Sequence, residues 1–191
     1  VLCNLGTRNE PGVDKKSKEQ KLEYLHQAHD LAVKMGRSYG LAIIEFNLAC
    51  IYYAAENLPD ATIFLEKCVK IADENEYLQI MSFGRGLLGR IAIEQGTKQQ
   101  AYSYLKQALE FSTISNFQTT SCEVVEVIAE LCISNNQRDE AVVLLSCVFD
   151  KLPDNSNSRT LPALQTTEEQ LAQLKQDLGE ERYERSFQKG R

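Results

Sequence analysis

The sequence lacks the features that mark several large classes of protein. No apolar run approaches the ~20 residues that a membrane-spanning helix requires, and no basic stretch precedes an apolar core as in a signal peptide. The net charge of −6 disfavours a nucleic-acid surface, which needs an excess of positive charge. Alternating apolar and polar residues of strand type are missing as well. We therefore expect a helical, cytoplasmic protein that makes no direct contact with nucleic acid or membrane.

Metal-binding patterns are also scarce. Histidine occurs only at His26 and His29, one helical turn apart and beside Asp30, which gives either two metal ligands without a third or the polar surface of a helix. No two cysteines form a C-x-x-C pair, so we interpret the thiols as small buried apolar groups rather than zinc ligands or disulfides. The sequence predicts no metal and no cofactor. The six cysteines are Cys3, Cys50, Cys68, Cys122, Cys132 and Cys147.

Motifs of catalysis are absent or misplaced. There is no G-x-x-x-x-G-K-[ST] phosphate loop, and no Ser/His/Asp or Cys/His set can be assembled. Gly84, Gly86 and Gly89 have the spacing of a dinucleotide fingerprint, which functions only between a strand and a helix. Here the three glycines fall inside a predicted helix, where Gly89 is explained by helix packing. The other two indicate a kink or the close approach of a ligand. We expect no enzyme and no catalytic residue.

What the sequence does contain is a repeat. Residues of the same type recur at one constant sequence separation, which is that between Ala49 and Gly89. Small residues that follow a large aliphatic residue recur at this offset, and so does a second column of small residues further along each unit. A repeat of this length predicts a solenoid, in which each unit buries its apolar face against its neighbours. The aligned columns are Ala49, Gly89 and Ala129; Ala61, Ala101 and Ala141; Leu65, Leu105 and Leu145; and Cys68, Ala108 and Val148, with a half unit upstream at Lys21, Leu25 and Ala28.

Each repeat unit is predicted to contain two helices. Apolar residues lie at helical spacing before and after a polar break in every unit. The breaks fall at residues 56–60, 95–98 and 135–138, where Pro59 suits a first helical turn and Gly96 suits a helix C-terminus. The chain is therefore predicted to be all-α.

These units resemble the tetratricopeptide repeat. Its pattern of a large residue, a small residue and an aromatic residue is met by Leu48, Ala49 and Tyr52, and its second helix is met by the alanine column described above. The sequence has no tryptophan, which the family often has in the first helix, and its offset is longer than the family's usual ~34 residues. The resemblance implies a right-handed α-solenoid of about three and a half long repeats over residues 15–152.

The two ends of the chain differ from the repeats. Residues 1–14 are predicted to be a loop or the degenerate remnant of a preceding helix, and residues 153–165 are predicted to be a polar linker. A helix should begin at Thr166 or Thr167, with Glu169 and Gln170 three residues on as the capping-box partners. We predict that residues 166–191 fold back as a helical cap on the second helix of the last unit. There they would cover Val142, Leu145 and Val148.

The C-terminal tail is similar to that of bacterial signalling ATPases of the STAND class and related transcriptional regulators. In those proteins a leucine-striped helix is followed by L-G-E, two spaced aromatic residues and a closing G-R. The resemblance implies that an ATPase or effector domain lies outside this chain. The matching residues are Leu178, Gly179, Glu180, Tyr183, Phe187, Gly190 and Arg191.

The tetratricopeptide resemblance also implies a binding groove lined by the first helix of each unit. Glu123, Glu126 and Glu130 share one helical face, which is either a solvated face or the acidic end of the groove. The expected function is protein or peptide binding in the sensing region of a larger bacterial regulator, with intramolecular contact to its ATPase domain. The alternatives are a free-standing adaptor and a small-ligand receptor. The predicted groove residues are Phe46, Asn47, Cys50, Tyr53, Phe83, Arg90, Glu94, Glu123, Glu126 and Glu130.

Overall fold

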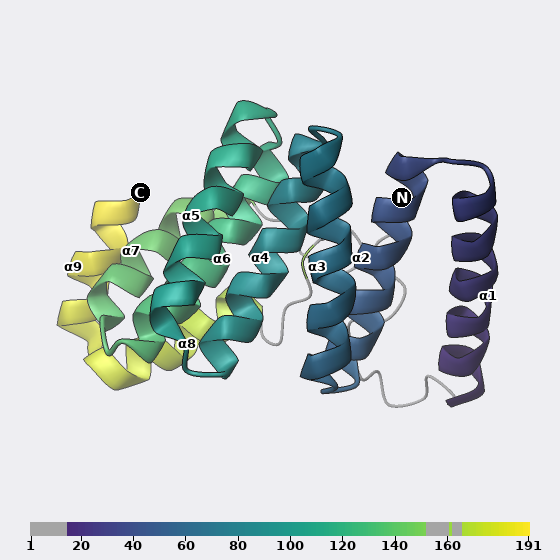
Figure 1. Ribbon diagram of the computed structural model, residues 1–191. Helices are drawn as coiled ribbons and strands as arrows, with labels where there is room; N and C mark the ends of the chain where they lie inside the picture. Colours follow the sequence, from purple (N-terminus) through teal and green to yellow (C-terminus); the bar gives the residue numbers. More distant parts are fainter. Residues whose placement is uncertain (1–14, 152–160, 162–165) are drawn as a thin grey trace.

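The computed structural model describes residues 15–151, 161 and 166–191. Within these residues all regular structure is helical, and successive helices pack side by side along a solenoid (Figure 1), which confirms the predicted fold class. The predicted N-terminal segment 1–14 lies outside the described residues, and so does the predicted linker apart from Leu161. The helices are α1 (Lys15–Lys34), α2 (Ser38–Ala54), α3 (Leu58–Glu74), α4 (Leu78–Glu94), α5 (Lys98–Ile114), α6 (Gln118–Ser134), α7 (Arg138–Val148), α8 (Thr167–Leu178) and α9 (Glu180–Gly190), with a 3-10 turn at Phe149–Lys151.

The helices α2 to α7 begin at evenly spaced positions, so each repeat unit consists of two helices. In each connection from α1 to α7 one residue has a positive φ. In the α4–α5 connection Gly96 has φ 73°, its N–H bonds to Ile93, and the N–H of Thr97 bonds to Ala92. This pair of bonds is a Schellman motif, which satisfies the last carbonyls of a helix. The residues with positive φ in these connections are Gly36, Glu56, Glu76, Gly96, Asn116 and Asn136.

Small residues let the helices of the solenoid approach closely. Ala61, Ala101 and Ala141 have no exposed surface, as the repeat alignment predicts. A Cβ atom added to Gly89 would lie 2.6 Å from the Leu105 side chain of α5, which confirms that this glycine serves helix packing. Gly84 has the same role toward α3, because its added Cβ would lie 2.6 Å from Val69.

A buried arginine joins the second helices of neighbouring units. Arg85 of α4 donates from Nη2 to Asp73 of α3 at 2.8 Å and from Nε to Gln107 of α5 at 2.9 Å. Its guanidinium also lies over the ring of Phe111, 5.1 Å from the centroid. The second helices α3 and α5 are thus connected through Arg85 of α4, which packs between them.

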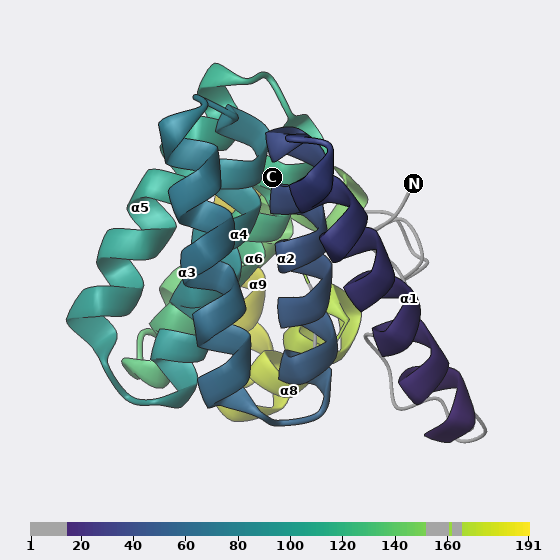
Figure 2. The ribbon, with the colours of Figure 1, turned by 45° about the vertical axis from the view of Figure 1, so that its right-hand side comes forward.

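The C-terminal helices cover the last repeat. Val142 and Leu145 of α7 pack with Leu171, Leu174 and Tyr183 of the tail, which confirms the predicted cap for these two positions. Val148 lies in a separate cluster with Cys122. The helix α8 begins as predicted, since Thr166 and Glu169 form a capping box. In Figures 1 and 2 α9 lies beside α7, and α8 lies nearer the first helices of the repeats.

The helix α9 approaches α7 very closely at its end. A Cβ atom added to Gly190 would lie 2.3 Å from the backbone oxygen of Val143, so only glycine fits there without a shift. At the other end of α9 Arg182 makes two hydrogen bonds to Asp139 of α7, and Ser186 donates to the same carboxylate at 3.0 Å. The hydrogen bond from Arg182 is the main reason that the pKa of Asp139 is lowered.

The cysteines within the described residues are thiols rather than disulfides. Cys50, Cys68 and Cys122 are buried, and Cys3 lies outside the described residues. Burial is the main cause that raises the pKa of the Cys122 and Cys132 thiols. Across the part of the chain that the structure describes, no group of three or more His, Cys, Asp and Glu residues is placed to hold a metal. No helix there is both long enough and apolar enough to cross a bilayer.

Candidate functional site: the inner face of the solenoid

The first helices of the repeat units, α2, α4 and α6, form one face of the solenoid. In Figure 2 they lie on the side toward α8, and α3 and α5 lie on the other side. We call the surface of α2, α4 and α6 that carries the predicted groove residues the inner face. Hydrogen bonds and ring contacts connect these three helices in order along the solenoid.

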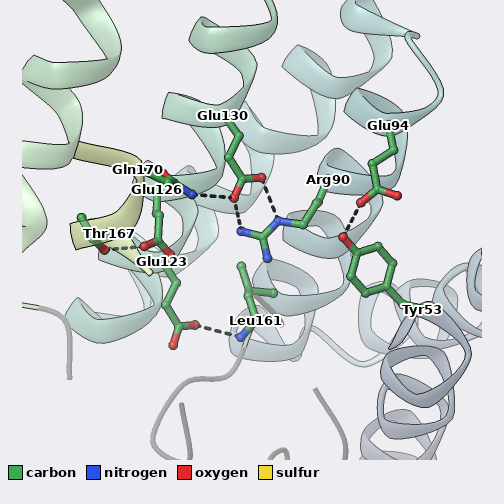
Figure 3. Close-up of polar contacts among 9 residues, drawn as sticks. All are labelled: Tyr53, Arg90, Glu94, Glu123, Glu126, Glu130, Leu161, Thr167 and Gln170. Carbon is green, nitrogen blue, oxygen red and sulfur yellow. Dashed lines mark hydrogen bonds and ion pairs between the residues drawn. The ribbon is translucent and has the colours of Figure 1, made fainter. Parts of the chain in front are cut away.

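Between α2 and α4 the inner face is joined by aromatic residues. The rings of Phe46 and Phe83 lie with centroids 5.7 Å apart, and both side chains are buried. The Tyr53 hydroxyl donates a short hydrogen bond to Glu94 (Figure 3). Burial is the main reason that the pKa of Tyr53 is raised far above its ordinary value, and the bond to Glu94 adds to it. The Tyr53 hydroxyl therefore keeps its proton and serves as a hydrogen-bond donor to Glu94.

Between α4 and α6 the inner face is joined by an ion pair. Arg90 is only 2% exposed and donates from Nε and Nη2 to the two oxygens of Glu130, at 2.9 and 2.8 Å. Burial, the largest single effect, lowers the pKa of Arg90, but Glu130 and other nearby groups outweigh it and the net pKa is raised. The third nitrogen, Nη1, is buried and has no hydrogen-bond partner among the described residues.

The remaining acidic residues of the inner face bind the polypeptide that follows the repeats. Glu123 and Glu126 are each 1% exposed, so the interpretation of a solvated acidic face is wrong. Glu123 accepts the backbone N–H of Leu161 at 3.1 Å, and Glu126 accepts a short hydrogen bond from the Thr167 hydroxyl (Figure 3). Both carboxylates thus lie beneath residues of the chain itself.

The predicted groove residues share one face but differ in accessibility. Glu94 is exposed, and Asn47 and Glu130 are half-buried. The others are buried under neighbouring helices, Leu161 and the start of α8, so the inner face at α4 and α6 is a covered surface. The buried set is Phe46, Cys50, Tyr53, Phe83, Arg90, Glu123 and Glu126.

Sequence reasoning missed the residues that cover this face. The sequence predicts Leu161 only as part of a linker, and Thr167 and Gln170 only as part of the start of a helix. A signal for the two helical residues exists in the repeat offset. Arg90 pairs with Glu130 at a separation of 40, and Gln170 donates to Glu130 at the same separation, at 3.5 Å. Extending the repeat columns by one unit therefore points to α8.

Comparison with known proteins supports the repeat assignment for the N-terminal half of the solenoid. A family model described as anaphase-promoting complex subunit 5 (ANAPC5), a tetratricopeptide-like helical repeat family, matches residues 12–95. This match supports a tetratricopeptide-like repeat protein. It covers less than half of the chain and ends with α4. No curated protein and no solved structure matches the chain. Repeats of this type generally mediate contacts between proteins and are generally non-catalytic.

Proposed function

We propose that this chain is a non-catalytic module that binds a protein or peptide segment along its inner face. The observation that carries the proposal is the contact of this face with polypeptide. Glu123 accepts a backbone N–H, and Glu126 accepts a threonine hydroxyl. A backbone N–H is available on almost any extended segment, so this recognition suits a peptide ligand. The matching family model, which is named for a subunit of a complex, is consistent with this proposal.

A peptide selection tests this proposal. A displayed library of short random peptides is selected on the chain, and the binders are measured by fluorescence anisotropy. Glu94→Lys reverses a charge on the exposed edge of the inner face, and Glu110→Lys makes the same change at an exposed position of α5. We expect Glu94→Lys to weaken the affinity for the selected peptides at least fivefold. Glu110→Lys should change that affinity less than twofold. Equal losses, or no binders at all, would contradict the proposal.

The finer proposal is that the module is the C-terminal sensing region of a larger cytoplasmic, bacterial STAND-type signalling regulator that controls transcription. It rests on the resemblance of the tail to that class. Three residues of that resemblance, Tyr183, Phe187 and Gly190, pack on α7. An ATPase domain of the same protein would then contact the repeats within one molecule. The coding sequence upstream of Val1 tests this proposal, because a G-x-x-x-x-G-K-[ST] loop should be found there.

A further inference from the structure

Leu161 occupies a notch in the inner face. Its side chain is 3% exposed and belongs to the main apolar cluster of the repeats. A Cβ atom added to Gly86 of α4 would lie 2.8 Å from its Cδ1 atom, so the leucine fills the space where any other residue would carry a side chain. Its backbone N–H is bound by Glu123 of α6. One leucine is therefore held by its side chain and by its backbone, between two helices of the inner face.

The glycine beneath Leu161 is not required by the repeat itself. Glycine in the interior of a helix is destabilising relative to alanine. In α4 the cost at Gly84 and Gly89 is explained by the neighbouring helices α3 and α5, which approach at Val69 and Leu105. At Gly86 the three nearest atoms to an added Cβ all belong to Leu161 rather than to either helix. Gly86 thus forms a leucine-sized notch on the face where ligands of such repeats would lie.

The notch also contains a polar group that Leu161 leaves unsatisfied. Arg90 follows Gly86 by one helical turn on the same face, and in Figure 3 its third nitrogen points toward the Leu161 side chain. This nitrogen is the buried Nη1 atom that lacks a partner among the described residues. A buried donor without an acceptor is unfavourable. A leucine side chain offers no acceptor, so Leu161 fills the notch without completing its hydrogen bonds.

We propose that this notch is the principal subsite for a partner peptide, and that Leu161 is an internal ligand which the partner displaces. The inference rests on the proposed function and specifies its ligand. The peptide is an extended segment that places a leucine in the Gly86 notch and its backbone N–H on Glu123. A carboxylate or amide oxygen beside that leucine accepts from Nη1 of Arg90.

Displacement has a measurable consequence for affinity. A ligand attached to the same chain competes at an effective concentration on the order of millimolar. A free peptide therefore binds the wild-type chain weakly, even when the notch suits it well. Removing the Leu161 side chain removes this competitor and should reveal the intrinsic affinity.

The experiment uses the full chain and a labelled peptide of residues 156–166, SNSRTLPALQT. We expect Leu161→Ala to bind this peptide at least tenfold more tightly than the wild-type chain in fluorescence anisotropy. Gly86→Ala in the Leu161→Ala background should fill the notch and reverse the gain at least tenfold. The matched control is Gly40→Ala in the same background, because its added Cβ meets only Arg37, at 3.9 Å. It should change the affinity less than twofold, and circular dichroism should show every variant folded.

Other results would overturn the proposal. The proposal fails if Leu161→Ala binds the peptide no more tightly than the wild-type chain does. It also fails if adding Gly86→Ala leaves the affinity of Leu161→Ala for the peptide unchanged. Self-association of the wild-type chain that Leu161→Ala abolishes, measured by sedimentation, would assign the notch to a second copy instead. If selected peptides depend on Glu94 but not on Leu161 or Gly86, only this inference fails. If no peptide binds even to Leu161→Ala, the proposed function fails with it.

The acceptor is tested separately with peptide variants. Aspartate is placed in turn at each of the two positions on either side of the leucine. At least one of these peptides should bind Leu161→Ala threefold more tightly than the parent peptide, because its carboxylate can accept from Arg90. Uniformly weaker binding would show that Arg90 takes no part in the subsite.

Discussion

The two ends of the solenoid differ in how far their apolar residues are buried. At the C-terminal end Leu174 is 2% exposed and Tyr183 is 8% exposed, because α8 and α9 close over α7. At the N-terminal end Tyr24 and Leu31 of α1 are 62% and 58% exposed, and they lie two helical turns apart on one face of the helix. No described residue covers them.

The difference shows what a terminal repeat needs. A solenoid unit buries its apolar face only against its neighbours, so the last unit requires a cap with a polar outer side. The two short C-terminal helices supply such a cap, because their leucine and aromatic stripes face α7 and their charged residues face solvent. The helix α1 supplies no comparable cover, since Ala32 is its only described side chain that is buried.

The largest effect should follow from removing the cap. Deletion of residues 166–191 exposes Val142 and Leu145 and removes Leu171, Leu174 and Tyr183 from the core. Burial of each such side chain contributes about 1.5–3 kcal/mol, so we expect a loss of ~4 kcal/mol or more in urea unfolding. Sedimentation should show self-association. Deletion of residues 1–37 should cost much less. Equal losses of unfolding free energy for the two deletions would contradict this difference between the ends.

Two glycines near the two ends should respond to alanine in opposite directions. Gly190→Ala drives a Cβ atom into the backbone of Val143, so overpacking should destabilise the chain by ~1–3 kcal/mol. Gly40→Ala meets only ordinary contacts in α2 and should stabilise it by about 0.5–1 kcal/mol through helix propensity. Thermal unfolding measures both changes. A neutral Gly190→Ala would contradict the close crossing of α7 and α9.

A weaker effect should depend on pH at the capped end. The pKa of Asp139 is lowered chiefly by its hydrogen bond from Arg182, so its charged form stabilises the folded state. This contribution is complete above the ordinary pKa of 3.8 and is lost as the pH falls through the lower folded value. Because the pair is largely exposed, the effect should be roughly 0.2–1 kcal/mol. The melting temperatures of the wild-type chain and Asp139→Asn should differ at pH 7 and converge as the pH falls below the ordinary pKa of 3.8 and through the lower folded value.

The smallest effect is expected at the uncovered end. Leu31→Lys places a charge on a side chain that is already exposed, so the free energy of unfolding should change by less than ~0.5 kcal/mol. Leu174→Lys is the matched change at the capped end and should be severely destabilising. A large loss for Leu31→Lys would mean that α1 is covered in solution.

The sequence allowed the repeat architecture to be predicted because periodic apolar and small residues report packing directly. The repeat offset aligns Ala61, Ala101 and Ala141 as one column of small residues, and all three have no exposed surface. The turns at Glu56 and Glu76 were harder to read, because glutamate does not favour a positive φ. Pro59 marks the break after Glu56, whereas only the even register of the neighbouring turns identifies the turn at Glu76.

The inner face was predicted as a set of positions but not as a set of contacts. Arg90 and Glu130 were assigned to one face, yet their bidentate pairing depends on how two helices stack. Leu161 could not be placed, because it belongs to a segment without periodicity and its neighbours in space, Glu123 and Gly86, are distant in sequence. Such a contact has no local signature.

The even spacing of the helices limits how the length of this chain can change. Helices α2 to α7 start at equal intervals and alternate between the inner and the outer side. Insertion or loss of a single helix with its connection would exchange the two sides for everything that follows, and would turn Glu123 and Glu126 away from their partners. A change by one helix pair would keep every downstream helix on its own side. The solenoid can therefore grow or shrink by whole helix pairs without exchanging its inner and outer sides.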